Sequence, residues 1–123
     1  MNRTYAQSEI VQINTLDGPL YHMRIPLIFR FGLINDFFLD NPGTTMIDLP
    51  LKRSGVINLL IFLDNNTDVK YTKQQWLDLL NAADYLDLRI DYVDMLLDHV
   101  LSELTGTGMM ERLTIRDAIN QLR

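Results

Sequence analysis

A helix can be read from the spacing of apolar residues between positions 76 and 86. Apolar side chains recur there at i, i+3, i+4, i+7 and i+10, on one face of a helix: Trp76, Leu79, Leu80, Ala83 and Leu86. Thr72 precedes this pattern and Gln75 follows it three residues on, which is the spacing of a capping box. The chain is therefore expected to fold around a helix that begins after Thr72 and buries one face.

The same stretch places small and polar residues beside its buried face. Ala82 and Ala83 leave room for a neighbouring helix to approach closely. Asp84, Tyr85 and Asp87 fall toward the rim of the apolar stripe. Polar groups beside a close helix contact indicate a surface for a protein partner, although the position of Tyr85 fits equally well a core tyrosine whose hydroxyl reaches the surface.

Two short strands are expected ahead of this helix, at residues 10–15 and 20–25, because both contain strand-favouring residues around an Asp-Gly-Pro turn at residues 17–19. Alternation in the second strand predicts one buried and one exposed face. The residues expected to be buried are Tyr21, Met23 and Ile25, and those expected to point outward are His22 and Arg24. Pro26 is expected to end the strand.

A single helix is expected over residues 27–40, where apolar residues recur at helical spacing before Asn-Pro-Gly at residues 41–43. Gly32 inside it costs about 1 kcal/mol against alanine, so tertiary packing must offset the loss. Residues 46–49 are expected to form a third short strand that Pro50 closes.

Three further helices complete the expected order. Ser54 is a suitable N-cap for residues 55–63, whose almost wholly apolar sequence is typical of a helix in the middle of a domain. Residues 91–104 carry the clearest amphipathic pattern in the chain, and a last helix is expected over residues 111–122. The apolar face of the helix at 91–104 comprises Val93, Leu96, Leu97, Val100, Leu101 and Leu104.

Composition bounds the class of protein. The 123 residues suit one domain, and 47% hydrophobic with 22% charged residues is a globular balance. A net charge of -5 argues against nucleic acid as a main ligand and favours a basic partner surface. The absence of cysteine excludes disulfides and thiolate metal sites. Neither a signal peptide nor a membrane-spanning run is recognised, so a soluble protein of the cytoplasm or nucleus is expected.

Residues with the chemistry of catalysis do not form a recognisable pattern. The serines lie in no Gly-x-Ser-x-Gly elbow, and no glycine loop has the lysine that a phosphate site needs. His22 and His99 fall in different elements without an acidic partner at ligand spacing. No enzyme activity, cofactor or metal is therefore expected.

A series of aspartates recurs every three or four residues from position 84 to position 98. Its spacing is not that of a calcium loop. Two interpretations remain: a solvated acidic face with a helix-capping role, or a docking edge for a basic partner. The series comprises Asp84, Asp87, Asp91, Asp94 and Asp98.

Several short motifs, in order, resemble the Skp and elongin-C branch of the BTB/POZ fold, the adaptors of cullin ubiquitin ligases. Asn-Thr-Leu-Asp-Gly at residues 14–18 resembles the opening turn of that family, and Met-Ile-Asp-Leu-Pro at residues 46–50 its third strand. Ala-Ala-Asp-Tyr-Leu-Asp at residues 82–87 resembles its Ala-Ala-Asn-Tyr-Leu-Asp helix end. Ile-Arg-Asp-Ala-Ile-Asn at residues 115–120 is similar to the Ile-Arg-x-x-Phe-Asn segment of Skp proteins.

The resemblance implies an α+β, BTB/POZ-like domain with a short, mostly antiparallel three-stranded sheet packed on about five to six helices. The implied divisions are a flexible tail at residues 1–9, a Skp-type domain at residues 10–104 and a short helical extension at residues 105–123. The implied function is that of a non-catalytic adaptor that joins a cullin-like scaffold to an F-box-like or BC-box-like receptor.

The resemblance also implies which residues meet each partner. The scaffold would contact Met46, Asp48, Pro50, Asp84 and Tyr85. The receptor would contact Leu101, Leu104, Leu113, Ile115 and Ile119. The alternative is a BTB domain that associates with itself as an assembly module, including a pathogen mimic of a host adaptor.

Overall fold

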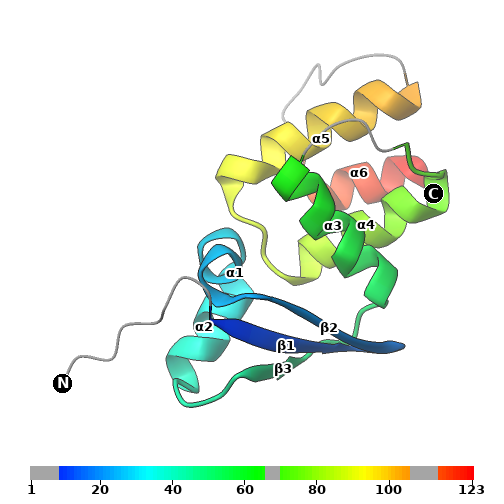
Figure 1. Cartoon of the computed structure of the whole chain (residues 1–123). Coiled ribbons are helices and arrows are strands. Elements are labelled where there is room, and N and C mark those ends of the chain that lie inside the picture. The colour runs from blue at the N-terminus through cyan, green and yellow to red at the C-terminus, as the bar shows by residue number, and fades with distance from the viewer. Residues whose placement is uncertain (1–8, 66–69, 106–113) are drawn as a thin grey trace.

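The structure is a computed structural model that describes residues 9–65, 70–105 and 114–123 (Figure 1). These residues form a small α+β fold with a three-stranded sheet and six helices, so the expected fold class is confirmed at that level. The elements are β1 (Ile10–Thr15), β2 (Gly18–Met23), α1 (Arg24–Arg30), α2 (Gly32–Asp40), β3 (Met46–Asp48), α3 (Arg53–Asn65), α4 (Lys73–Tyr85), α5 (Ile90–Thr105) and α6 (Ile115–Leu122).

The sheet is mixed, and the longer of its two strand pairings is antiparallel. Its strand order is β2-β1-β3, with β1 antiparallel to β2 and parallel to β3. A two-residue turn joins β1 to β2, whereas α1 and α2 lie between β2 and β3. β2 brings the chain back to the end of the sheet where β1 begins, and β3 starts from that same end after α1 and α2, so it runs parallel to β1.

The buried face of β2 is the opposite of the one expected. Leu20 is buried and His22 is half-buried, while Tyr21 is 63% exposed and Met23 is also exposed. The short turn pairs Thr15 with Gly18, and this register sets Leu20 opposite Ile13 on the inner face. Because side chains alternate along a strand, that one pairing fixes the side of every residue in β2.

The helix expected over residues 27–40 is two helices, and it begins earlier. The strand ends at Met23, so Pro26 lies in the first turn of α1, where proline is tolerated. The break lies at Phe31, whose backbone is extended and pairs with Leu88 in the linker between α4 and α5. A Cβ on Gly32 would collide with the carboxylate of Asp87, so a larger residue at this position would have to displace that side chain.

Arg24 was expected to point outward, yet it is fully buried at the start of α1. Its Nη2 donates to the carbonyl oxygen of Thr44 at 2.8 Å, and its Nε lies 3.2 Å from a carboxylate oxygen of Glu9. The guanidinium carbon also stands 4.2 Å from the ring centroid of Phe38. A buried arginine is tolerated here because these groups surround its charge.

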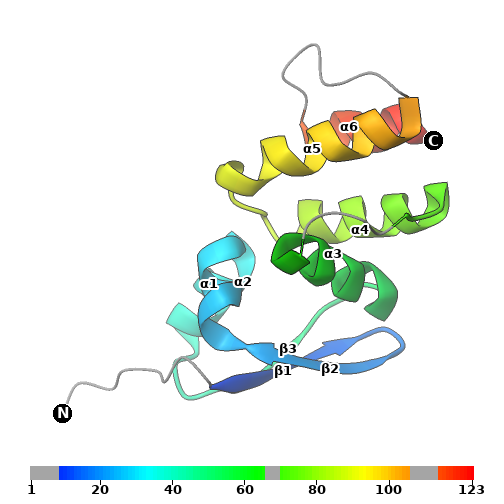
Figure 2. The ribbon, with the colours of Figure 1, turned by 45° about the horizontal axis from the view of Figure 1, so that its top comes forward.

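The remaining helices stack in layers away from the sheet (Figure 2). α3 follows the sheet, α4 packs on α3, and α5 and α6 lie beyond α4.

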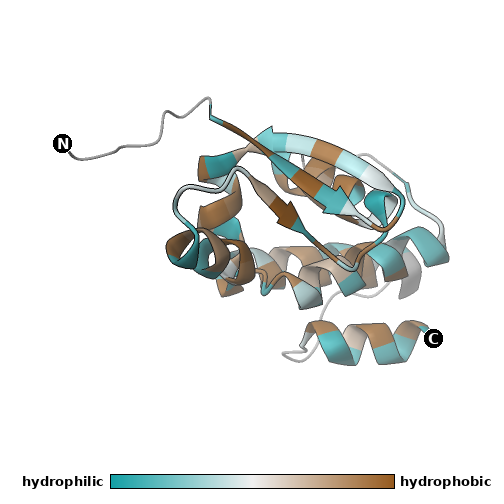
Figure 3. Ribbon diagram, turned by 90° about the horizontal axis from the view of Figure 1, so that it is seen from below, coloured by the Kyte–Doolittle hydropathy of each residue, from teal (hydrophilic) through white to brown (hydrophobic). Residues whose placement is uncertain are grey.

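Ser54 lies inside α3 rather than at its cap; instead, Oδ1 of Asp17 accepts from the backbone N–H of Arg53 at 2.7 Å. The capping box of Thr72 and Gln75 is confirmed at the start of α4. Polar and apolar residues alternate along the strands and divide α6 into two stripes (Figure 3).

Candidate partner-binding surfaces

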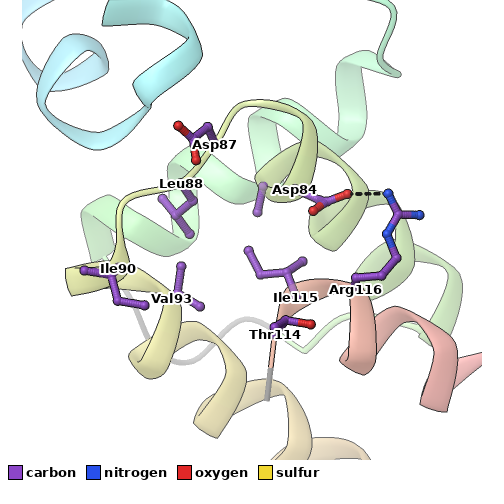
Figure 4. Close-up of a pocket in the computed structure, with 9 residues that line it drawn as sticks. Asp84, Asp87, Leu88, Ile90, Val93, Thr114, Ile115 and Arg116 are labelled. Atoms are coloured by element: carbon purple, nitrogen blue, oxygen red, sulfur yellow. Dashed lines mark hydrogen bonds and ion pairs between the residues drawn. The ribbon is translucent and has the colours of Figure 1, made fainter. Parts of the chain in front are cut away.

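Asp84 and Tyr85 are neighbours in sequence, but they face different surfaces. Consecutive residues of a helix point about 100° apart. Oδ2 of Asp84 accepts a hydrogen bond from Nη2 of Arg116 in α6 at 2.8 Å (Figure 4). Tyr85 is 44% exposed. Only Tyr85 of this pair therefore offers a side chain that is not already held by α6.

Tyr85 shares its face of α4 with Asp78 and Asn81, which lie two turns and one turn before it. These two residues line a hollow of about 300 Å³ between α4, the β1–β2 turn and the loop that follows β3. At the edge of the hollow, Nζ of Lys52 lies 3.7 Å from the Asp78 carboxylate. The lining residues are Leu16, Pro50, Leu51, Lys52, Asp78 and Asn81, and together with Tyr85 they are called the Tyr85 face below.

Two of the three other residues expected at the scaffold contact lie away from the Tyr85 face. Met46 and Asp48 are exposed on the outer face of β3, and Asp48 accepts from Nδ2 of Asn14 at 2.8 Å. Pro50, by contrast, belongs to the Tyr85 face. Pro50 thus lines the hollow beside α4, and exposed Tyr85 lies one turn beyond the lining residue Asn81 on that helix. Met46 and Asp48 lie on the sheet, and Asp84 lies on the α6 side of α4.

The residues expected to meet a receptor are mostly buried within the chain. Leu101, Ile115 and Ile119 belong to the buried core, and Ile115 and Ile119 hold α6 against its neighbours. A receptor would reach Ile119 only by displacing α6. Leu113 and the side chain of Leu104 lie outside the described residues.

An interhelical cavity of about 400 Å³ lies where the end of α4, the start of α5 and the start of α6 meet (Figure 4). α6 begins there with a second capping box, formed by Thr114 and Asp117. Because four separate segments line the cavity, no single stretch of sequence indicates it. Its lining residues are Ala83, Asp84, Asp87, Leu88, Ile90, Val93, Thr114, Ile115 and Arg116.

The two histidines have structural neighbours. Nε2 of His22 lies 3.5 Å from the carboxylate of Asp64, which also accepts from Nη1 of Arg30 at 2.6 Å. The ring of His99 packs against Phe62 with centroids 5.1 Å apart. Within residues 9–65, 70–105 and 114–123, no group of three or more acidic or histidine side chains is arranged to hold a metal ion.

Tyr71 forms an aromatic cluster with Trp76, Phe62 and His99, and its hydroxyl is titratable. Its ring lies edge-on to Trp76 with centroids 4.8 Å apart. Burial raises the pKa of the Tyr71 hydroxyl above its usual value of 10.0, because the apolar surroundings disfavour the phenolate.

Comparison of the chain with family models, curated proteins and solved structures finds no match. In the described part of the chain, no helix has the length and apolar character needed to cross a bilayer.

Proposed function

We propose that the chain is a non-catalytic adaptor with a BTB/POZ-like fold of the Skp type, which binds a cullin-like scaffold through the Tyr85 face. One observation carries the proposal: two segments that resemble the family, distant in sequence, line one hollow, and the third lies on the helix that forms its wall. Leu16 comes from the segment at residues 14–18 and Pro50 from residues 46–50, while Tyr85, from residues 82–87, is exposed one helical turn beyond the lining residue Asn81.

The chemistry of this surface supports a protein partner. An exposed tyrosine offers a large apolar ring with a hydrogen-bonding hydroxyl, a combination enriched at interface hot spots. Leu16 and Pro50 add exposed apolar area, and the hollow between them can receive a partner side chain. Lys52 and Asp78 supply charges of both signs at its edge.

The test is direct binding of purified cullin amino-terminal domains to the purified chain, measured by biolayer interferometry. Truncating a hot-spot tyrosine often costs about 2 kcal/mol or more, so Tyr85→Ala should weaken the Kd by about 30-fold. Tyr21→Ala is the matched control, because Tyr21 is exposed on the outer face of the sheet. Both variants should keep the circular dichroism spectrum and thermal unfolding of the wild type.

Two results would contradict the proposal. One is the absence of binding by any cullin domain at micromolar concentrations. The other is an unchanged Kd for Tyr85→Ala. Loss of fold in Tyr85→Ala would instead assign the ring a structural role, and that outcome also removes it from the proposed contact.

A second candidate, self-association, is favoured by the outer face of the sheet. The register sets exposed Ile10 opposite Met23, and Gln12 opposite both Tyr21 and Met46. The exposed apolar side chains on this face are Ile10, Tyr21, Met23 and Met46. A cluster of that kind on a solvent-facing sheet is typical of an interaction surface. Light scattering that gives a dimer mass for the wild type and a monomer mass for Tyr21→Ala would select this candidate.

A further inference from the structure

The interhelical cavity has an apolar floor built from four segments. Ala83 comes from α4, Leu88 from the α4–α5 linker, Val93 from α5 and Ile115 from α6 (Figure 4). Its volume of about 400 Å³ lies within the range of about 300–1,000 Å³ that is usual for ligand sites. The cavity can therefore receive a bulky apolar side chain.

The mouth of the cavity continues into a second hollow along the linker. The two hollows share Asp87, Leu88 and Ile90, and the second adds Arg89 and Asp91. Ile90 is 56% exposed, so an apolar side chain stands in solvent where the two hollows meet. A cavity that opens onto a shallow groove suits an extended peptide better than a compact small molecule.

The charges around the mouth are negative on balance. Asp84, Asp87 and Asp91 line the two hollows with Arg89 and Arg116, and the chain as a whole carries a net charge of -5. Arg116 pairs with Asp84, and Nη2 of Arg89 is turned to the carbonyl oxygen of Ile28 at 3.3 Å, a hydrogen bond that leaves its charge in place. Asp87 and Asp91 therefore exceed Arg89 by one negative charge, which favours a cationic ligand.

The wall that carries Asp87 and Leu88 is fixed in place. The carbonyl oxygen of Asp87 accepts from the backbone N–H of Gly32 at 2.9 Å, and the backbone N–H of Arg89 donates to the carbonyl oxygen of Arg30 at 2.9 Å. Asp87 itself holds a left-handed backbone with φ of 59°, which a non-glycine residue adopts rarely and at a cost. Its carboxylate lies beside Gly32 at the start of α2.

We infer that the interhelical cavity binds a basic peptide segment of a partner protein, whose apolar side chain enters between α4, α5 and α6 while its Lys or Arg residues meet Asp87 and Asp91. This inference rests on the proposed function in one respect, since it identifies the surface of the adaptor that binds the receptor. That surface is the interhelical cavity, which Ile115 lines, and binding there does not displace α6 from α4.

The probe is a short acetylated and amidated peptide with two central leucines flanked on each side by two lysines. Its counterpart has glutamates in place of the lysines. Methyl resonances of the isotope-labelled full chain are followed during titration at low and at physiological salt. With the lysine peptide, the shifts should be confined to the methyl groups that line the cavity, those of Leu88, Ile90, Val93 and Ile115. The glutamate peptide should leave these methyl groups unshifted.

Two pairs of variants separate the specific site from general attraction to an acidic chain. Asp87→Asn with Asp91→Asn should weaken binding of the lysine peptide about fivefold, the loss expected for two exposed ion pairs, and asparagine tolerates the left-handed backbone at position 87. The control, Asp36→Asn with Asp94→Asn, removes the same charge from exposed positions outside the lining and should change the Kd less than twofold. Ile90→Ser should also weaken binding, whereas Met95→Ser on the same helix should not.

Three results would overturn the inference. They are unshifted cavity methyl groups at millimolar lysine peptide, equal binding of the two peptides, and equal losses in the Asp87–Asp91 variant and its control. None of these results bears on Tyr85, because the effect of Tyr85→Ala is measured by the binding of cullin domains. A failed peptide titration and a failed scaffold assay are therefore distinguishable.

Discussion

Gly55→Ala tests how closely α3 crosses α4. A Cβ added at Gly55 would lie 2.7 Å from the backbone carbonyl oxygen of Asp78 and 3.1 Å from its carbonyl carbon. Alanine gains about 1 kcal/mol over glycine in a helix, whereas overpacking in a close contact costs about 1–3 kcal/mol. The opposing atoms belong to the backbone of α4 and cannot rotate away, so the overpacking term should win. We expect the free energy of unfolding to fall by about 1 kcal/mol.

Urea denaturation of the purified chain, with midpoint and slope fitted separately, measures this change. Gly43→Ala is the matched control, because a Cβ at exposed Gly43 meets nothing within 4 Å. It should leave the stability unchanged or raise it by about 0.4–1 kcal/mol through the unfolded state. If Gly55→Ala is as stable as the wild type or more stable, the two helices do not cross at this distance and the argument for their packing fails.

Two further predictions concern the core and pH. Leu97 is 0% exposed in α5, so Leu97→Ala should cost about 2–5 kcal/mol of unfolding free energy in thermal or urea denaturation. Met95 on the same helix is 37% exposed, so Met95→Ala should cost much less. Equal losses in the two variants would place Leu97 at the surface. Because burial raises the pKa of Tyr71 above 10.0, the unfolded chain loses that proton at lower pH than the folded chain, and this contribution to stability is lost as pH rises past about 10. Tyr71→Phe should therefore lose less stability than the wild type between about pH 9 and pH 11, and parallel pH curves would contradict the assignment.

Local signals in the sequence were sufficient for the central helices. The Thr72 and Gln75 spacing predicted the start of α4, and the apolar spacing predicted the residues that it buries. The same holds for α5, where Val93, Leu96, Leu97, Val100 and Leu101 are buried. These features depend on contacts within one helix or on one continuous stripe, so the sequence of that helix contains the necessary information.

The failures all involve a second segment of the chain. The face of β2 depends on a register set by the turn, and the break at Phe31 depends on Leu88 in the α4–α5 linker. Arg24 is buried because Glu9, Thr44 and Phe38 converge on it from other elements. Alternation along one strand could not reveal such partners, although Gly32 in an apolar helix was a sign of close approach.

The residues of the candidate site also divide into those that the sequence could predict and those that it could not. Tyr85 was identified at the rim of α4 from its own helix, and it is exposed. Asp84 was grouped with it, although a 100° rotation per residue already places adjacent helical residues on different faces. The interhelical cavity could not be predicted, because its lining comes from α4, the linker, α5 and α6.

The pairing of the α1–α2 break with the α4–α5 linker bears on the order in which the chain folds. Nη2 of Arg89 reaches the carbonyl oxygen of Ile28 across 61 positions, and the backbone bonds at Gly32 and Leu33 span similar separations. Contacts this distant in sequence slow folding, since the intervening chain must be ordered before they form. During synthesis from the amino terminus, α1 and α2 leave the ribosome long before the linker does. The extended geometry at Phe31 is therefore completed late, after α4 has emerged and closed back on it.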